Sequence, residues 1–257
     1  MDITSLYESN IIAVPQKEQA LAWMIEEGPL VQDPGLPMPA LRSLVAQQRI
    51  LRLHRGLYLA PTANGRLPSF PSTINLVDPE GYVSGQGALS LHGFNDQDIS
   101  RWYSVGPSHR GDITYGPFRA HFVESPARSR NASRTQVEVQ SEPVVVATPA
   151  RAIIDEVDLT PYGLDPVEVA RALRHTVGSG AVTEGDLMAE WKRTPSVAAA
   201  RRLGLLLEVV TGERSRAFLE VARSRGGVTR LRGDTVAEPV WRLFLPRSRE
   251  DIARASR

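Results

Sequence analysis

The sequence predicts an α+β protein: an N-terminal winged helix-turn-helix followed by a larger mixed α/β domain that ends in a helical region. Three observations lead to this prediction. Residues 41–59 change from helical to strand-like hydrophobic spacing, short extended segments alternate with helices in residues 67–160, and helical patterns dominate residues 161–257. The predicted domains are therefore residues 1–66 and 67–257, the second consisting of a small α/β part and a mainly helical part.

The winged helix is predicted from a helix that leads into a hairpin. Leu41, Leu44 and Val45 have i, i+3, i+4 spacing and would share one apolar face. From Ile50 the hydrophobic period changes to two, and Gly56 marks the turn of a tight hairpin. In a winged helix-turn-helix the helix enters the major groove of DNA, and we expect the hairpin to lie against the phosphate backbone.

Polar side chains on this helix and hairpin are the candidate DNA-binding residues. They are Arg42, Ser43, Gln47 and Arg49 on the helix and Arg52, His54 and Arg55 on the hairpin. No acidic residue lies between Asp33 and Asp78, so anionic phosphate would be attracted to this segment, and arginine can also read guanine bidentately. A solvated basic face of an ordinary helix and hairpin is the alternative interpretation.

The segments on either side complete the N-terminal domain. A first helix is predicted over residues 16–27, ended by Gly28 and Pro29. Residues 30–39 stand where a helix-turn-helix places its second helix, but three prolines and a glycine disfavour a regular helix there. This segment is either a single helical turn or part of a degenerate motif. Residues 60–72 are predicted to be a linker, with the domain boundary near Arg66.

The larger domain is predicted to contain five strands and several capped helices. A short helix runs from its N-cap Ser84 to His92, and Asp165, Thr183 and Thr194 each start a later helix. The predicted strands are 101–105, 118–123, 137–140 and 143–147, the last leading directly into a helix over 149–157, and residues 218–225 and 236–245 are predicted as a helix and a strand.

Composition and motifs exclude several classes of protein. The net charge is only +1, and the absence of cysteine excludes disulfides, thiol catalysis and cysteine-ligated zinc. The N-terminal residues lack the pattern of a signal peptide, and no apolar run approaches the roughly 20 residues of a membrane span. The sequence therefore predicts a cytoplasmic protein with no membrane partner.

No catalytic or cofactor-binding constellation stands out. The histidines never occur at metal-ligand spacing, and the Gly85-Gln-Gly87 run fits a flexible helix entry better than a dinucleotide fingerprint. Asp186, Glu190 and Lys192 form a faint nuclease-like pattern, but they lie in a predicted helix, whereas such a site uses a strand. We therefore expect a non-enzymatic protein without metal or cofactor.

Three stretches, in this order, resemble the AbiEi-type antitoxins of the AbiE abortive-infection toxin–antitoxin systems. They are the hairpin at residues 50–61, the segment Tyr82-Val-Ser-Gly-Gln-Gly-Ala-Leu-Ser-Leu-His-Gly-Phe94, and residues 143–155, where a strand leads to a helix ending in Ile-Ile-Asp. The resemblance covers roughly residues 16–158. At the second and third blocks it matches Ser84, His92 and Asp155, for which we expect the structural roles of helix cap, turn packing and helix end.

The resemblance implies a bacterial antitoxin that binds double-stranded operator DNA through its winged helix and represses its own operon. It also implies that the C-terminal domain counteracts an AbiEii-type, nucleotidyltransferase-like toxin, in the type IV manner that needs no stable complex. The alternative is an antitoxin that binds and blocks its toxin directly and has weak DNA binding or none. The arginines near the C-terminal end would then contact an acidic partner; they also fit a second phosphate-contacting surface or merely solvated helix faces.

Overall fold

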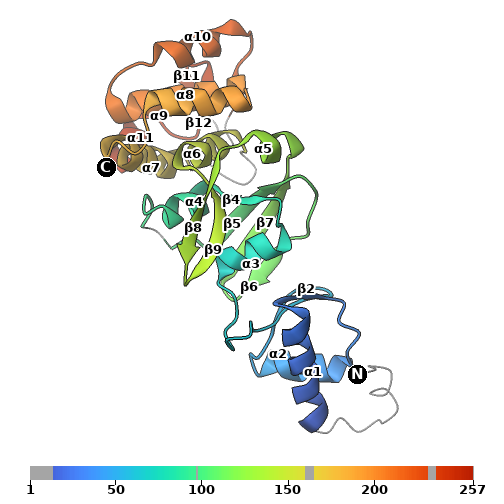
Figure 1. Cartoon of the computed structure of the whole chain (residues 1–257). Helices are drawn as coiled ribbons and strands as arrows, with labels where there is room; N and C mark the ends of the chain where they lie inside the picture. Colours follow the sequence, from blue (N-terminus) through green and yellow to red (C-terminus); the bar gives the residue numbers. More distant parts are fainter. Residues whose placement is uncertain (1–13, 97, 160–164, 231–235, 257) are drawn as a thin grey trace.

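The computed structural model describes residues 14–96, 98–159, 165–230 and 236–256. Figure 1 shows the chain as three tiers, with the N-terminal helices and hairpin at one end, a six-stranded sheet in the middle and the C-terminal helices at the other end. The described residues form helices α1–α11 and strands β1–β12, and the larger sheet contains both parallel and antiparallel pairs. The mixed α/β character that the sequence predicts is therefore confirmed.

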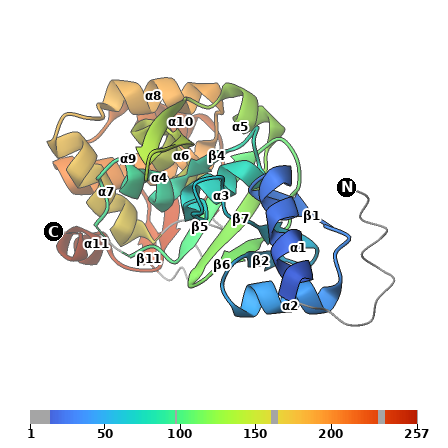
Figure 2. The ribbon, with the colours of Figure 1, turned by 60° about the horizontal axis from the view of Figure 1, so that its bottom comes forward.

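The N-terminal tier consists of two helices and a three-stranded sheet (Figure 2). Its elements are α1 (Val14–Glu27), β1 (Leu30–Gln32), α2 (Met38–Ala46), β2 (Leu51–His54) and β3 (Leu57–Leu59). The strand order is β1-β3-β2, and both neighbouring pairs are antiparallel. The sheet therefore joins the predicted hairpin to a strand from the segment between the two helices.

The proline-rich segment before α2 forms neither a regular helix nor a helical turn. Residues 30–32 pair with β3, and Asp33 then adopts a φ of 42° while its N–H donates to the carbonyl of Gly56 (2.7 Å). Pro37 occupies the N-cap position of α2, and Pro39 lies in its first turn, where a missing N–H costs no hydrogen bond. The segment thus provides an edge strand and a bend in place of a second helix.

The middle tier is a six-stranded sheet with strand order β6-β7-β5-β4-β9-β8. Its strands are β4 (Tyr82–Ser84), β5 (Arg101–Gly106), β6 (Ile113–Tyr115), β7 (Phe118–Glu124), β8 (Arg134–Val139) and β9 (Glu142–Ala147). The β5–β7 and β4–β9 pairs are parallel, and the other neighbours are antiparallel. Consecutive residues of β5 from Trp102 to Val105 are buried, so both faces of the sheet centre are covered.

Four helices accompany this sheet, and one of them replaces the end of the predicted linker. They are α3 (Phe70–Val77), α4 (Gly85–Leu91), α5 (Pro126–Asn131) and α6 (Pro149–Asp158). Ser69 caps α3, since its Oγ accepts from the N–H of Ser72 (3.3 Å). The Phe70 ring stacks on Phe118 with 5.3 Å between ring centroids and contacts Tyr115 at 5.6 Å. These tertiary contacts hold a helix in a segment rich in proline.

The C-terminal tier is mostly helical. Its helices are α7 (Pro166–Gly178), α8 (Glu184–Arg193), α9 (Val197–Thr211), α10 (Arg216–Ser224) and α11 (Arg249–Ala255). The predicted caps at Asp165 and Thr183 are confirmed: Asp165 accepts from the N–H of Val167 (2.9 Å), and Thr183 forms a capping box with Asp186. Ser196 caps α9, two residues after the start predicted at Thr194.

A second, three-stranded sheet interrupts the helices near the C-terminal end. Its strands are β10 (Thr229–Arg230), β11 (Val236–Glu238) and β12 (Leu243–Leu245), in the order β10-β12-β11. The single strand predicted over residues 236–245 is therefore two antiparallel strands, and Arg242 between them has a φ of 53°.

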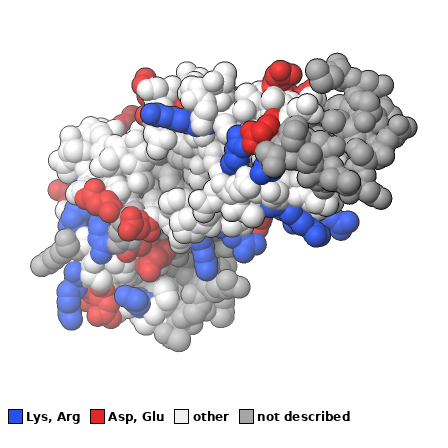
Figure 3. Space-filling view, turned by 90° about the horizontal axis from the view of Figure 1, so that it is seen from below, with Lys and Arg blue, Asp and Glu red and all other residues white. Residues whose placement is uncertain are grey.

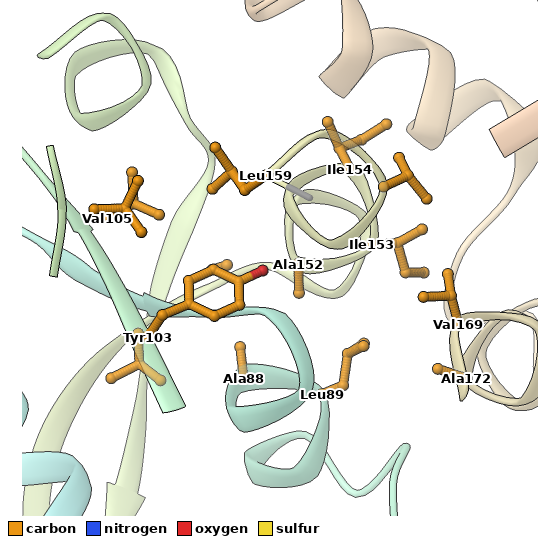
Figure 4. Packing of buried hydrophobic residues seen from close by; sticks show 14 of the residues in the cluster. Ala88, Leu89, Tyr103, Val105, Ala152, Ile153, Ile154, Leu159, Val169 and Ala172 are labelled. Atoms are coloured by element: carbon orange, nitrogen blue, oxygen red, sulfur yellow. The ribbon is translucent and has the colours of Figure 1, made fainter. Parts of the chain in front are cut away.

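The middle and C-terminal tiers share one hydrophobic core (Figure 4). Ile153 and Ile154 of α6 are fully buried, and Ile153 points toward Val169 and Ala172 of α7. On the other side of α6, Tyr103 of β5 lies beside Ala152. Helix α6 therefore connects the sheet to the C-terminal helices.

Candidate nucleic-acid interface

Helix α2 presents one apolar face and one polar face, as its spacing predicts. Leu41 and Leu44 are buried, Val45 is partly buried, and Arg42 is exposed with Ser43 at the edge. The helix ends at Ala46, so Gln47 is its C-cap and Arg49 lies in the turn that follows. Our placement of Gln47 and Arg49 on the helix is therefore wrong, because the chain turns at Gln48, which has a φ of 56°.

Arg49 is paired with an acid of its own chain. Its guanidinium contacts the carboxylate of Glu18 on α1, and this hydrogen bond lowers the pKa of Glu18 below its usual value. Both side chains are more than one third exposed, so water screens the pair and it adds little stability. The charge of Arg49 is nevertheless partly compensated, which makes it a weaker candidate for a phosphate contact than Arg42.

The hairpin places its cations on one side and its leucines on the other. Arg52 and His54 are exposed, whereas Leu53 between them is buried, and this alternation is kept although the pairing register with β3 shifts between Arg52 and His54. Arg55 is also exposed, at the turn, and the Nε of Arg52 donates to the carbonyl of His54 (3.3 Å). The three candidate hairpin residues therefore share one solvent-facing edge.

Gly56 is required at this turn for two reasons. Its φ is 80°, which side chains rarely adopt, and a Cβ at this position would lie 2.3 Å from Oδ1 of Asp33. The Asp33 carboxylate thus packs against the turn beside Arg55 and places one negative charge close to the exposed cations.

The hairpin is held between two hydrophobic clusters. Leu53, Leu57 and Leu59 belong to the core of the middle and C-terminal tiers, whereas Ile50 and Tyr58 belong to a smaller cluster with α1 and α2. Strand β2 also packs against β6 of the larger sheet. The hairpin is therefore fixed to the rest of the chain along its apolar side, a contact that the sequence pattern did not reveal.

The loop between β5 and β6 lies beside the hairpin and was not a candidate from the sequence. A Cβ on Gly111 would be 3.9 Å from Cδ2 of His54, and His109 in the same loop is exposed. Asp112 adds negative charge, which is paired with His121 (2.7 Å) and Arg119 (3.2 Å). Because this proximity is created by tertiary packing, no local sequence signal indicates it.

Figure 3 shows the molecule from below, with the N-terminal tier toward the viewer. Lys and Arg side chains form a row along the lower edge of this tier, while at the opposite end of the same face acidic and basic side chains are mixed. The charge of the face is therefore unevenly distributed, although the whole chain carries a net charge of only +1. This distribution suits a polyanion better than the overall charge suggests.

The second and third sequence blocks meet in a buried ionic network. Asp155 is fully buried and accepts from Ser84 Oγ (2.7 Å) and Tyr82 Oη (3.1 Å). Its other oxygen contacts the guanidinium of Arg151, which is also fully buried, and lies 3.5 Å from Arg128 Nε. Burial and the neighbouring carboxylate raise the pKa of Tyr82. The cluster joins β4 to α6 inside the core, where a ligand has no access.

Three structural roles expected for these blocks need correction or refinement. Ser84 stands at the N-cap of α4, but its hydroxyl makes no cap bond because it donates to Asp155. Asp155 does not end a helix, since α6 continues to Asp158. His92 is the C-cap of α4, and its Nε2 lies 2.8 Å from the carbonyl oxygen of Ala147, so it packs at the turn as expected.

The nuclease-like residues all lie on α8, and two of them have structural partners. Asp186 completes the capping box with Thr183, and Glu190 lies 3.5 Å from Nη1 of Arg151. Lys192 is exposed on the same helix. Within the described ranges, no group of three or more His, Asp or Glu side chains is placed to hold a metal ion. Nor is any helix in the described part both long and apolar enough to span a bilayer.

The chain resembles a solved structure over most of the length of both chains. The crystal structure of RV2827C protein from Mycobacterium tuberculosis matches with a TM-score of 0.54 and 13% sequence identity, covering 90% of this chain and 91% of that chain. At this identity the likeness concerns the fold alone. No protein-family model matches the sequence, and a search of curated proteins gives no match.

Proposed function

We propose that this chain is a DNA-binding antitoxin of the AbiEi type that represses its own operon. The observation that supports this most is the N-terminal arrangement, in which α2 leads into a hairpin whose exposed edge carries Arg52, His54 and Arg55. The β1-β3-β2 order supports the proposal because it is compatible with the sheet of a winged helix in which one helix is replaced by an extended segment. In this proposal the C-terminal part counteracts a nucleotidyltransferase-like toxin.

Each candidate residue has a distinct role in the proposed complex. Arg42 and Ser43 on α2 face the major groove, where Arg42 contacts a base edge or an adjacent phosphate. Arg52, His54 and Arg55 hold the sugar–phosphate backbone alongside the hairpin. Gln47 and Arg49 lie past the helix end and contact the flank of the site, and binding competes with the pairing of Arg49 to Glu18.

The test is a gel-shift titration on the DNA upstream of the operon, at two salt concentrations and against a scrambled duplex. Each phosphate that the protein neutralises contributes about 0.9 to the slope of log affinity against log salt. The Arg52→Ala, Arg55→Ala double variant should therefore reduce the magnitude of this slope by about 1.8. The matched control replaces Arg130 and Arg223, two exposed arginines on α5 and α10.

The control variant should bind as the parent does, because its substituted residues lie outside the proposed surface. An unchanged slope for the hairpin variant would refute the backbone role of the hairpin. Equal retardation of the operator and scrambled duplexes would refute sequence-specific reading.

A second candidate function is direct binding of the toxin with weak DNA binding or none. The observation that favours it is the missing helix between β1 and α2, since that helix normally supports the recognition helix on DNA. Co-purification of the chain with its neighbouring toxin would support this second function. Neutralisation of a co-expressed toxin without co-purification would support the first.

A further inference from the structure

A groove of about 670 Å³ opens in the C-terminal tier, away from the hairpin and α2. Its walls come from the end of α8, the start of α9, the second half of α10 and the loop that leads to β10. Trp191, Arg201, Glu220, Arg225 and Thr229 are among the lining residues. The volume is in the range of small-ligand sites, roughly 300–1,000 Å³.

A buried arginine forms part of the groove wall and has no acidic partner among the described residues. Arg201 of α9 is only 3% exposed. Its hydrogen-bond acceptors are neutral: the carbonyl oxygens of Ala222 (3.1 Å), Arg225 (2.8 Å) and Gly226 (3.5 Å) and Oγ1 of Thr229 (3.2 Å). Burial, together with the nearby charge of Arg242, lowers the pKa of Arg201. A charge in this position is stabilised by an anion.

The hydrogen bonds of Arg201 also fasten the end of α10, which is a structural role. They do not use all of its donors: a guanidinium has five N–H groups, and the second N–H of Nη1 meets no acceptor in the described part of the chain. Carbonyl dipoles offset only part of a full positive charge. The arginine is therefore both held in a fixed position and left with donor capacity.

Two other features of the groove favour an anion. Val197 and Ala198, in the first turn of the 15-residue helix α9, line it, and first-turn N–H groups lack intrahelical acceptors. The Ser196 hydroxyl accepts from the N–H of Ala199 (3.2 Å) and donates to Oδ1 of Asp158 (2.7 Å), so the N–H groups of Val197 and Ala198 keep their capacity while one carboxylate lies near this helix end. Arg225 adds an exposed guanidinium at the wall.

We propose that this groove binds a small phosphate-bearing ligand, with the phosphate between Arg201, Arg225 and the first turn of α9. Trp191 supplies a flat wall beside it, because its indole N–H donates to the carbonyl of Ser196 (2.8 Å) and fixes the ring. Aromatic rings of this kind stack on nucleobases, so a nucleotide uses more of the groove than inorganic phosphate does. Glu220 is the one acid among the described lining residues and opposes the anion.

The test is isothermal titration of the whole protein with two probes, inorganic pyrophosphate and ATP without added metal. We expect saturable binding with a Kd below about 1 mM. Arg225→Gln should weaken it by about tenfold, as loss of a charge-assisted hydrogen bond does. Glu220→Gln should strengthen it by about threefold, because it removes like charge. The matched control Arg223→Gln changes an exposed arginine on α10 outside the groove and should bind as the parent does.

The substitutions at Arg225 and Glu220 alter exposed side chains, so both variant proteins should fold. The test does not require a substitution of Arg201, because the loss of its hydrogen bonds would release α10. Trp191→Leu shows whether the ligand is a nucleotide or a simple phosphate. If the variant binds ATP more weakly than the parent does but binds pyrophosphate equally well, the ligand is a nucleotide. If the variant binds both probes as the parent does, the groove recognises the phosphate alone. Absence of saturable binding to either probe overturns the proposal. So does binding that Arg225→Gln and Glu220→Gln leave unchanged.

Discussion

The carboxylate of Glu208 offers a direct test of how the C-terminal tier is held together. This side chain of α9 is buried, and it accepts hydrogen bonds from Trp241 Nε1 (2.7 Å), Arg214 Nη2 (2.9 Å) and Arg249. Burial alone raises the pKa of Glu208, but the hydrogen bonds from Arg214, Trp241 and Arg249 outweigh it and lower the pKa from 4.5 to about 2. Replacing Glu208 by glutamine keeps an acceptor for Trp241 and removes the charge.

The lowered pKa gives both the sign and the size of the effect. A carboxyl group that ionises more easily in the folded state contributes stability above its unfolded pKa, and loses this contribution as the pH falls from 4.5 toward about 2. At about 1.4 kcal/mol for each pKa unit, the contribution at neutral pH is about 3 kcal/mol. Because the Arg214 side chain is 45% exposed, salt should reduce this value.

The assay is urea unfolding of the parent protein and Glu208→Gln at pH 7 and pH 3 in low salt. The variant should be less stable by about 3 kcal/mol at pH 7, and the difference should fall to about half at pH 3, where protonation has begun to cost the parent its advantage. Glu213→Gln, at an exposed acid just after α9, is the control and should differ from the parent at neither pH. An equal loss for Glu208→Gln at both pH values would refute the electrostatic reasoning.

Two further substitutions test the packing of the core. Gly204→Ala should destabilise the protein by about 1–3 kcal/mol or more in urea unfolding, because a Cβ would lie 2.1 Å from the fully buried Trp241 ring; an unchanged midpoint would show that the ring can move. Asp155→Asn should cost about 3–5 kcal/mol by the same measurement, since it leaves the buried Arg151 without its main counter-charge; a loss below about 1 kcal/mol would mean that Glu190 compensates.

Elements with local signals could be predicted from the sequence. The α2 helix and the hairpin follow from hydrophobic spacing and one glycine, and the starts of α7 and α8 follow from Asp165 and Thr183. In each case the deciding interaction joins residues a few positions apart. The side chain that caps the helix or the glycine that permits the turn is therefore visible in the sequence itself.

Elements that depend on distant partners could not be predicted in this way. Strand β1 has only three residues and exists because β3 pairs with it, and α3 is held by rings of β6 and β7. In the candidate site, too, local features could be predicted from the sequence and long-range contacts could not. The exposure of Arg42 and Arg52 follows from periodicity, whereas the pairing of Arg49 with Glu18, 31 residues away, does not.

The alternation of side chains along β2 has two consequences. It lets a short hairpin pack against the larger part of the chain through its leucines and present its cations to solvent. Leu53 is buried in the core of the larger part of the chain, so its neighbours Arg52 and His54 point away from that core, and they reach solvent because β2 is an edge strand of its sheet. A shift of the strand register by one residue would bury the cations and expose the leucine, which the core does not tolerate. The hydrophobic contact of Leu53 therefore sets the orientation of the exposed cations on β2. The position of these cations relative to the β5–β6 loop is determined by the packing of β2 against β6, and not by the hairpin sequence.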